Sequence, residues 1–327
     1  HPSGLTIELL FEQNGQQYAL AENGLLERGE DGEWRQVLTG SGAMLTARHI
    51  SALMAASDGK LWVGYFDRGL DILPPTSGAA RHVEDDHVFC INRIVADPKQ
   101  GAVAVATANG LVMFDSDGRE RQVLERKAGL IADHVTDVAL YRDGLAAATP
   151  AGITFLQPGG ATSLYAFEGL VNNHVYTLGV DGDQILAGTL GGLSLLKGET
   201  ISRNFTTANS GLRHNWITSL ARAGDSWLIG TYGAGVLRMT SDGTIESTEI
   251  TRDGVVVNPT AMLDDGHLAL AGTLSNGLLV SDANGMRWKT VTAGLPSLDV
   301  TALAADHGVI YVGTESGLVK IPESRLE

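Results

Sequence analysis

The sequence is poor in cysteine and in basic residues. Its 327 residues include one cysteine, Cys90, which excludes an intrachain disulfide framework and a cysteine-cluster metal site. The 23 Lys and Arg are outnumbered by 38 Asp and Glu, for a formal net charge of −15. Because no basic stripe is visible, we expect neither nucleic acid nor an anionic membrane surface as a partner.

Long apolar runs are also missing. No stretch of about 18 uncharged apolar residues occurs, so the sequence predicts no membrane span in this chain. No segment keeps a 3.6-residue apolar period, which argues against long helices. The chain starts at His1 without a methionine, and we interpret it as processed or trimmed, so a missing signal peptide says nothing about its compartment.

Glycine, in contrast, is abundant, with 41 residues, and it recurs at regular intervals. The repeated motif consists of an apolar strand, a small turn, Gly and a second apolar strand, as in ILAGTLGGLSLL at 185–196. Eight copies follow one another with spacings of 40 to 45 residues between their anchoring glycines. These anchors are Gly24, Gly69, Gly110, Gly152, Gly192, Gly235, Gly277 and Gly317.

Each repeat reads as four short strands. Runs of four to six residues rich in Val, Ile, Leu and Thr are bounded by Gly and Asp, which is typical of strands and turns. Four strands per repeat of this length indicate a β-propeller blade. We therefore predict an all-β, eight-bladed β-propeller that occupies residues 1–327 as a single domain. The last repeat ends after three strands, so its fourth strand is either absent or supplied by residues upstream of His1 in a longer parent chain.

The full unit can be written as L-x-x-x-H/D-V-T-x-L, a turn, and L-W-V-G-T-x-x-G-L. Its first half matches residues 130–138, 170–178 and 295–303, and its second half matches 61–70 and 310–318. This pattern resembles the two-component regulator propeller repeat, which occurs in the extracytoplasmic sensor halves of bacterial hybrid histidine kinases and in related secreted propellers. The resemblance implies a bacterial, periplasmic or secreted, ligand-binding sensor domain. No kinase and no second β-sandwich domain follow in the sequence, so any signalling output would lie on a longer parent chain or in a secreted assembly.

One residue in each repeat precedes the first strand, which in propellers lines the axial channel. Alignment of the eight copies puts these residues at Thr6, His49, His87, His134, His174, Trp216, Asn258 and Asp299. Four consecutive repeats thus carry histidine, the commonest protein metal ligand. The arc of His49, His87, His134 and His174 is a candidate for a metal, an anion or a pH-sensitive contact. The alternative is structural, because Asn, Asp and His are also frequent in tight turns before strands.

A second group of candidates lies in turns expected on the same face. The second repeat supplies Arg48, Tyr65, Phe66, Asp67 and Arg68, and the sixth supplies His214, Trp216 and Tyr232. Aromatic rings flanked by Arg and Asp suit a flat polar ligand. The predicted ligand-binding residues are therefore Arg48, His49, Tyr65, Phe66, Arg68, His87, His134, His174, Trp216 and Tyr232.

These residues favour non-catalytic recognition of a small molecule, a glycan or a protein partner on the channel face. No phosphate-binding loop, nucleophile elbow or HExxH motif is present, and the sequence requires no cofactor. We therefore assign no catalytic residue. Two alternatives stay open: a metal-assisted lyase or hydrolase that uses the histidine arc, and a structural scaffold that docks proteins.

Overall fold

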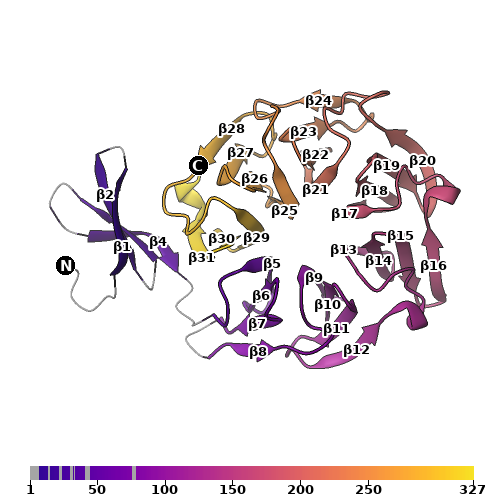
Figure 1. The fold of residues 1–327 in the computed structure, drawn as a ribbon, viewed down its shortest axis with the longest axis horizontal. Coiled ribbons are helices and arrows are strands. Elements are labelled where there is room, and N and C mark those ends of the chain that lie inside the picture. The colour runs from indigo at the N-terminus through magenta and orange to yellow at the C-terminus, as the bar shows by residue number, and fades with distance from the viewer. Residues whose placement is uncertain are drawn as a thin grey trace.

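The computed structural model describes residues 7–13, 15–21, 24–29, 32, 34–40, 45–75 and 79–327 (Figure 1). These residues form 31 strands and three short 3₁₀ turns. All strand pairs within a unit are antiparallel, because short connections of two to seven residues join consecutive strands. The strands form eight units in chain order. The first seven units have four strands each, and the last unit has three. The predicted all-β fold with eight repeated units and a three-stranded last unit is confirmed.

We name each unit after its first strand. The β1 unit consists of β1 (Ile7–Gln13), β2 (Gln16–Ala21), β3 (Gly24–Arg28) and β4 (Trp34–Gly40). The next three are β5 (Ile50–Ala55), β6 (Leu61–Tyr65), β7 (Leu70–Leu73), β8 (Arg81–Val83); β9 (Ile91–Asp97), β10 (Ala102–Thr107), β11 (Gly110–Asp115), β12 (Glu120–Leu124); and β13 (Asp137–Tyr141), β14 (Gly144–Thr149), β15 (Gly152–Gln157), β16 (Gly160–Leu164).

The remaining four units complete the chain. They are β17 (Val175–Asp181), β18 (Gln184–Thr189), β19 (Gly192–Lys197), β20 (Thr200–Phe205); β21 (Ile217–Ala223), β22 (Ser226–Thr231), β23 (Val236–Met239), β24 (Ile245–Ser247); β25 (Val257–Asp264), β26 (Leu268–Thr273), β27 (Leu278–Asp282), β28 (Trp288–Val291); and β29 (Val300–Asp306), β30 (Val309–Thr314), β31 (Gly317–Pro322). The 3₁₀ turns are η1 (Arg126–Ala128), η2 (Ala166–Glu168) and η3 (Glu323–Arg325). In the described part of the chain, no helix has the length and apolar character needed to cross a membrane.

Seven of the eight units surround a central channel. Their first strands contact one another in the order β5, β9, β13, β17, β21, β25 and β29, and β29 then contacts β5 (Figure 1). The ring is closed where Ala302 and Ala304 of β29 join the hydrophobic cluster of Ile50 and Leu53 of β5. The β5 unit therefore occupies the place beside β29.

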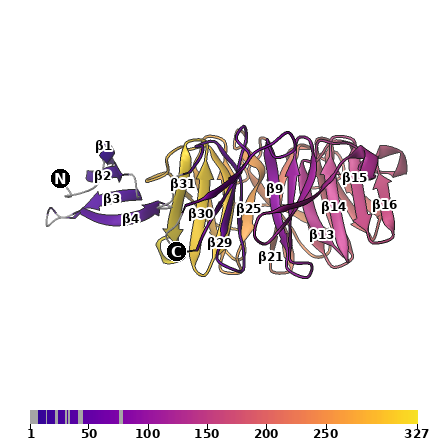
Figure 2. The same cartoon turned by 90° about the horizontal axis from the view of Figure 1, so that it is seen from below.

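The β1 unit lies outside this ring, beside its last unit (Figures 1 and 2). β4 pairs with β31 through Val319 with Gly40 and Lys320 with Thr39, which joins β1–β4 and β29–β31 into one seven-stranded sheet. Leu25 of β3 adds to the hydrophobic cluster of the last unit. The strand next to β31 is thus β4 of the first repeat.

The middle strands of each unit form the core between neighbouring units. All six residues of β10, β22 and β26 are buried, including both faces of each strand. Strands that are covered on both faces read as continuous apolar runs, which is why the repeated motif carries so few polar residues.

The anchoring glycines are required by the turn between the second and third strands. Gly192 has a φ of +143°, and a Cβ atom there would collide with the carbonyl oxygen of Phe205 in β20. Gly317 has almost the same φ of +142° but lies in the unit without a fourth strand of its own, and its nearest neighbour would be Pro296 at 3.9 Å. The fourth strand therefore adds a steric requirement to the conformational one.

Candidate functional site

The strand directions fix which loops share a face of the ring. Since successive strands alternate in direction, the turns between second and third strands and the loops between units lie on one face, which we call the cavity face. The first-to-second and third-to-fourth turns lie on the other, which we call the opposite face. In Figure 2 the strands of the ring stand between these two faces.

Each first strand of the ring begins at the cavity face, and most begin with a β-bulge. In β5, β9, β17, β21 and β29 one residue near the start is skipped in the pairing with the second strand. A bulge leaves its extra residue unpaired and re-aims its side chain. The extra residues are Ser51, Asn92, Tyr176, Thr218 and Thr301, and Thr136 holds the same place just before β13.

Several of these polar side chains join neighbouring units. They donate hydrogen bonds to the first buried carbonyl of the next unit, from Asn92 to Val135 (2.7 Å), Thr136 to Val175 (2.5 Å) and Thr301 to Ile50 (2.5 Å). Asn258, the equivalent residue of β25, donates to Val300 (2.8 Å). Ser51 Oγ and Thr218 Oγ1 occupy equivalent positions and have no hydrogen-bond partner among the described residues. The belt of polar residues at the channel is therefore largely structural.

The bulge of β25 is larger than the others and crosses the channel. Its pairing with β26 jumps from Val257 to Met262, although only Gly272 separates their partners. The crossing segment reaches β9 on the far side, where Arg93 Nη1 donates to the carbonyl oxygen of Thr260 (3.1 Å). Thr260 Oγ1 donates in turn to the carbonyl oxygen of Asn92 (3.3 Å). Thr260 has a φ of +54°, which is strained for a β-branched residue and is held by these contacts.

A cavity of about 580 Å³ opens at the channel mouth against this crossing segment. Six of the seven ring units contribute to its wall. The lining residues are His49, Ile50, Ser51, Phe66, Ile91, Asn92, His134, Thr136, His174, Tyr176, Asn258, Pro259, Thr260, Asp299, Thr301 and Glu315. Its size and its mixture of aromatic and polar groups are those of a small-molecule site.

One side of the cavity is acidic. Asp299 precedes β29 and Glu315 lies in the turn between β30 and β31, and the Glu315 amide donates to the carbonyl oxygen of Asp299 (3.1 Å). Asn258 Nδ2 donates to Asp299 Oδ1 (2.7 Å). Burial raises the pKa of Asp299, and the nearby charge of Glu315 raises it further. His49 Nε2 lies 3.5 Å from Glu315 Oε1.

Across the ring the wall is aromatic. The rings of His174 and Tyr176 are stacked with centroids 4.4 Å apart, and Tyr176 contacts Trp216 at 5.2 Å. Trp216 stacks in turn on Tyr232 at 3.9 Å. Burial lowers the pKa of His134, and burial together with the neighbouring His134 lowers the pKa of His174. Both imidazoles therefore favour the neutral form.

The structure brings part of the predicted set together. His49, Phe66, His134 and His174 line the cavity, as do Asp299 and Asn258. Asn258 does not precede its first strand as the alignment predicts, because it is the second residue of β25 and holds the place of the bulge residues. Trp216 and Tyr232 extend the aromatic stack away from Tyr176. Arg48 and Arg68 are exposed and are not among the lining residues. Thr6 lies outside the described residues.

Tyr65 is not on the surface. Its side chain is fully buried, and its hydroxyl donates to Asp71 Oδ2 (2.5 Å), which is itself buried. Asp71 also accepts from the amide of Thr46 (2.8 Å) and lies 2.8 Å from His82 Nδ1. Tyr65 thus belongs to an internal polar network of the β5 unit. No local sequence pattern predicts this network.

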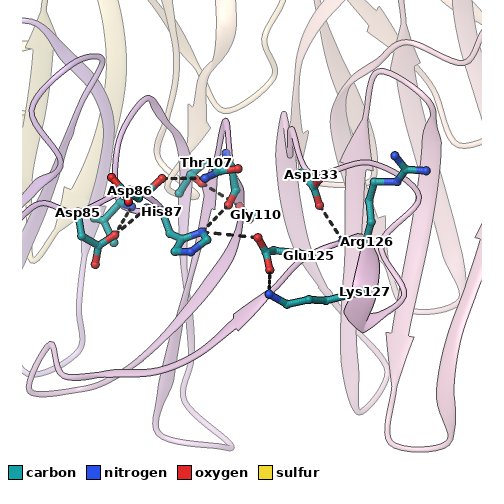
Figure 3. Close-up of polar contacts among 11 residues, drawn as sticks. Asp85, Asp86, His87, Thr107, Gly110, Glu125, Arg126, Lys127 and Asp133 are labelled. Carbon is teal, nitrogen blue, oxygen red and sulfur yellow. Dashed lines mark hydrogen bonds and ion pairs between the residues drawn. The ribbon is translucent and has the colours of Figure 1, made fainter.

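His87 is also displaced from the predicted position. The residue that precedes Ile91, the first residue of β9, is Cys90, three positions later than His87. His87 Nδ1 instead lies 3.0 Å from the carbonyl oxygen of Asn109 and 4.0 Å from Glu125, within a network of loop residues (Figure 3). The loop between β8 and β9 is longer than the repeat suggested, so the alignment was shifted there.

The histidine arc does not form a metal centre. Within the described part of the chain, no three His, Cys, Asp or Glu side chains are grouped so that they could hold a metal ion. His49, His134 and His174 share one cavity, but they come from units at different points around the ring.

Sequence reasoning missed the bulge residues and the acidic turn. Tyr176 and Thr136 follow the aligned histidines by two positions, and Glu315 lies in the turn between β30 and β31, where the sequence predicts no candidate. The bulges have a sequence signal. In each ring unit, a polar or aromatic residue directly follows the apolar residue at or just before the start of the first strand.

No family model and no curated protein sequence match this chain. Several solved structures do. The extracellular domain of a protein assigned to a hybrid two component system of B. thetaiotaomicron superposes with a TM-score of 0.70 at 18% identity, over 86% of this chain and 41% of that one. The extracellular domain of a protein assigned to a one component system of the same organism gives 0.68 at 22% identity, over 87% and 40%. A streptogramin B lyase gives 0.66 at 10% identity, over 84% and 94%.

These similarities concern the fold. At such identities they show the fold alone: this chain is folded like part of these two extracellular domains and like the lyase. The chain spans about 40% of the length of the two extracellular domains.

Proposed function

We propose that this chain is a non-catalytic recognition module that binds a small molecule in the cavity on the cavity face of the ring. The observation that carries the proposal is the cavity itself, which is lined by six ring units and has acidic and aromatic walls. The crossing segment of β25 supports it, because Thr260, a residue with a strained backbone, lines this cavity, and strained residues cluster at functional sites.

The hydrogen bonds of the wall indicate which residues are available to a ligand. The side chains of Asn92, Thr136 and Thr301 are engaged with neighbouring units. His134, His174 and Tyr176 on one side and Asp299 and Glu315 on the other keep groups that face the cavity. We therefore assign ligand contacts to these five residues, with His49 and Phe66 at the rim.

The setting of the module follows from its neighbours. Two similar structures are extracellular domains, and this chain spans about 40% of each. Together with the resemblance of its repeats, this supports an extracytoplasmic module of a longer bacterial protein, in which ligand binding would be passed to other domains.

Lyase or hydrolase chemistry on the histidine arc is the weaker alternative. It is supported by the lyase neighbour and by the neutral state that His134 and His174 favour, which a general base requires. Metal-assisted chemistry would need several ligands around one ion, and the described imidazoles are not grouped in that way. Recognition needs no such grouping.

The proposal is tested by screening small molecules against the chain by thermal shift, with neutral, acidic and basic compounds and simple sugars. Hits are then titrated by isothermal calorimetry against Tyr176→Ala and against Arg142→Ala, a control on the opposite face. We expect Tyr176→Ala to weaken binding roughly tenfold, since a stacked aromatic contact is lost, and the control to bind like wild type.

Two results would overturn the proposal. One is the absence of any hit, and the other is a hit whose affinity Tyr176→Ala leaves unchanged. If mass spectrometry shows that the chain converts a hit to a new product, the function is catalytic and the recognition proposal is wrong.

A further inference from the structure

We infer that the cavity selects a ligand that carries a cationic amine on a flat apolar body, with the amine at Asp299 and Glu315 and the body against His174 and Tyr176. The inference rests on the proposed function, because it names the ligand class of the same cavity. It is drawn from the distribution of charge around the wall.

The charged groups of the wall are of one sign. Among the lining residues in the described part of the chain, Asp299 and Glu315 are the carboxylates, and neither Lys nor Arg is present. Arg48 and Arg68 come from the same face but are not among the lining residues. An anionic ligand would therefore meet two carboxylates without a fixed cation to offset them, whereas a cation would be attracted.

Among the described residues, the two carboxylates also have no Lys or Arg as an ion-pair partner. Asn258 donates to Asp299, but an amide neutralises no charge. His49 lies 3.5 Å from Glu315, and both side chains are more than half exposed, so water screens this contact. Burial is the main cause of the raised pKa of Asp299, and the neighbouring charge of Glu315 raises this pKa further. A bound ammonium group would relieve that repulsion.

The opposite wall suits the rest of such a ligand. The stacked rings of His174 and Tyr176 belong to the β17 unit, three places from the β29 unit in one direction around the ring and four in the other. Because burial keeps His134 and His174 toward the neutral form, these imidazoles do not repel a cation. Aromatic faces also attract cations, so a positively charged ligand is favoured on both sides.

The test compares three probes that share an indole body and differ in charge: tryptamine, indole-3-ethanol and indole-3-acetate. Their affinities are measured by isothermal calorimetry with the full chain at pH 7.5, at low and at physiological ionic strength. We expect tryptamine to bind at least about tenfold more tightly than the alcohol, the acetate to bind weakest, and the preference to shrink as salt is added.

The variants Asp299→Asn, Glu315→Gln and their combination locate the effect. We expect the combined variant to bind tryptamine and the alcohol within about twofold of each other, while the alcohol itself binds as it does to wild type. Asp183→Asn, on the opposite face, removes one negative charge far from the cavity and is expected to keep the full preference. Circular dichroism melts confirm that each variant is folded.

The outcomes separate this inference from the proposed function. If the alcohol or the acetate binds as tightly as tryptamine, in a manner that depends on Tyr176, charge selection is wrong and the cavity remains a ligand site. If tryptamine binding is the same in the combined variant, or is undetectable at about 10 mM, the inference is overturned. If, in addition, the compound screen gives no hit, the proposed function falls with it.

Discussion

The two faces of the ring are built from the same repeated strands but carry different side chains. On the ring, the large hydrophobic residues that are exposed all lie in turns or loops of the cavity face: Phe66, Phe89, Tyr165, Phe167, Leu190, Tyr232, Leu274 and Leu298. The opposite face carries tight turns of Gly and Asp that are connected by ion pairs, such as Lys60 with Asp117 and Arg142 with Asp183.

This difference follows from the connections. The opposite face joins strands of the same unit, and its short turns leave room mainly for the residues that the turn geometry demands. The cavity face also joins one unit to the next, and its longer loops are free to vary. Loops of this kind on a rigid scaffold are where binding residues are most often found. The cavity face is therefore where recognition is expected.

The largest effect should come from adding one methyl group to a turn on each face of the β17 unit. Gly192→Ala puts a Cβ against the carbonyl oxygen of Phe205, whereas Gly182, in the turn between β17 and β18, has open space and a φ of +60°. We expect Gly192→Ala to lower the free energy of unfolding by roughly 2–4 kcal/mol, and Gly182→Ala by about 1 kcal/mol. Urea denaturation measures both, and equal losses would contradict the difference between the faces.

A somewhat smaller effect is expected in the channel, between the two faces. Arg93 Nε lies 3.6 Å from Asp137 Oδ1, and the Asp137 side chain is buried. Arg93→Met should cost roughly 1–3 kcal/mol at neutral pH, because it leaves this carboxylate without a cation. Burial already raises the folded-state pKa of Asp137 above its unfolded value of 3.8, so the folded state binds the proton more tightly. The free energy of unfolding therefore falls as pH rises from the unfolded pKa to the folded-state pKa.

Arg93→Met should therefore steepen the loss of stability as pH rises above about 4. The double variant Arg93→Met/Asp137→Asn removes the charge and is expected to recover most of the stability at pH 7. Chemical denaturation at several pH values measures this, and a double variant as unstable as the single one would disprove the role of the buried charge.

The next comparison concerns protonation of the cavity wall. Since the folded-state pKa values of His134 and His174 are lowered from 6.5, the unfolded chain takes up protons first as pH falls below about 6.5. These two residues should therefore make the melting temperature drop between pH 7.5 and pH 5. The variant His134→Gln/His174→Gln should show a shallower drop, whereas His267→Gln, in an exposed turn of the opposite face, should keep the wild-type slope. A double variant with an unchanged slope would contradict this prediction.

The smallest effect is expected on the opposite face itself. Arg142 Nη2 and Asp183 Oδ1 are 2.6 Å apart, but both side chains are about half exposed. Exposed pairs contribute little, because water screens them and ordering two long side chains costs entropy. Arg142→Ala should leave the melting temperature close to that of wild type, and added salt should remove any difference that remains. A large loss that persists at high salt would mean that the two faces are stabilised in the same way.

The position of each repeat along the sequence could be predicted because it depends on local requirements. Gly192 and its equivalents need positive φ, and buried strands need apolar residues on both faces, so each unit could be located without its neighbours. The choice of seven units for the ring depends on the contact between β5 and β29, which are far apart in the chain.

The site was only partly predictable for the same reason. His49, His134 and His174 could be found by alignment, because they precede strands of regular spacing. The burial of Tyr65 depends on Asp71 in the following strand, and the three-residue shift at His87 depends on the length of one loop. The acidic wall is assembled from Asp299 and Glu315, which meet only when β29 and the turn after β30 are folded together.

The seam between β29 and β5 also has a consequence for biosynthesis. The hydroxyl of Thr301 donates to the carbonyl oxygen of Ile50, and 251 positions of sequence separate the two residues. Each earlier unit can pack on its predecessor as it leaves the ribosome, but the first strand of the β5 unit stays uncovered on one side until almost the whole chain has been made. At roughly 5–20 residues per second this exposure lasts for about 10 seconds or more. One apolar face of the first ring unit is therefore the surface of the nascent chain that is exposed for longest.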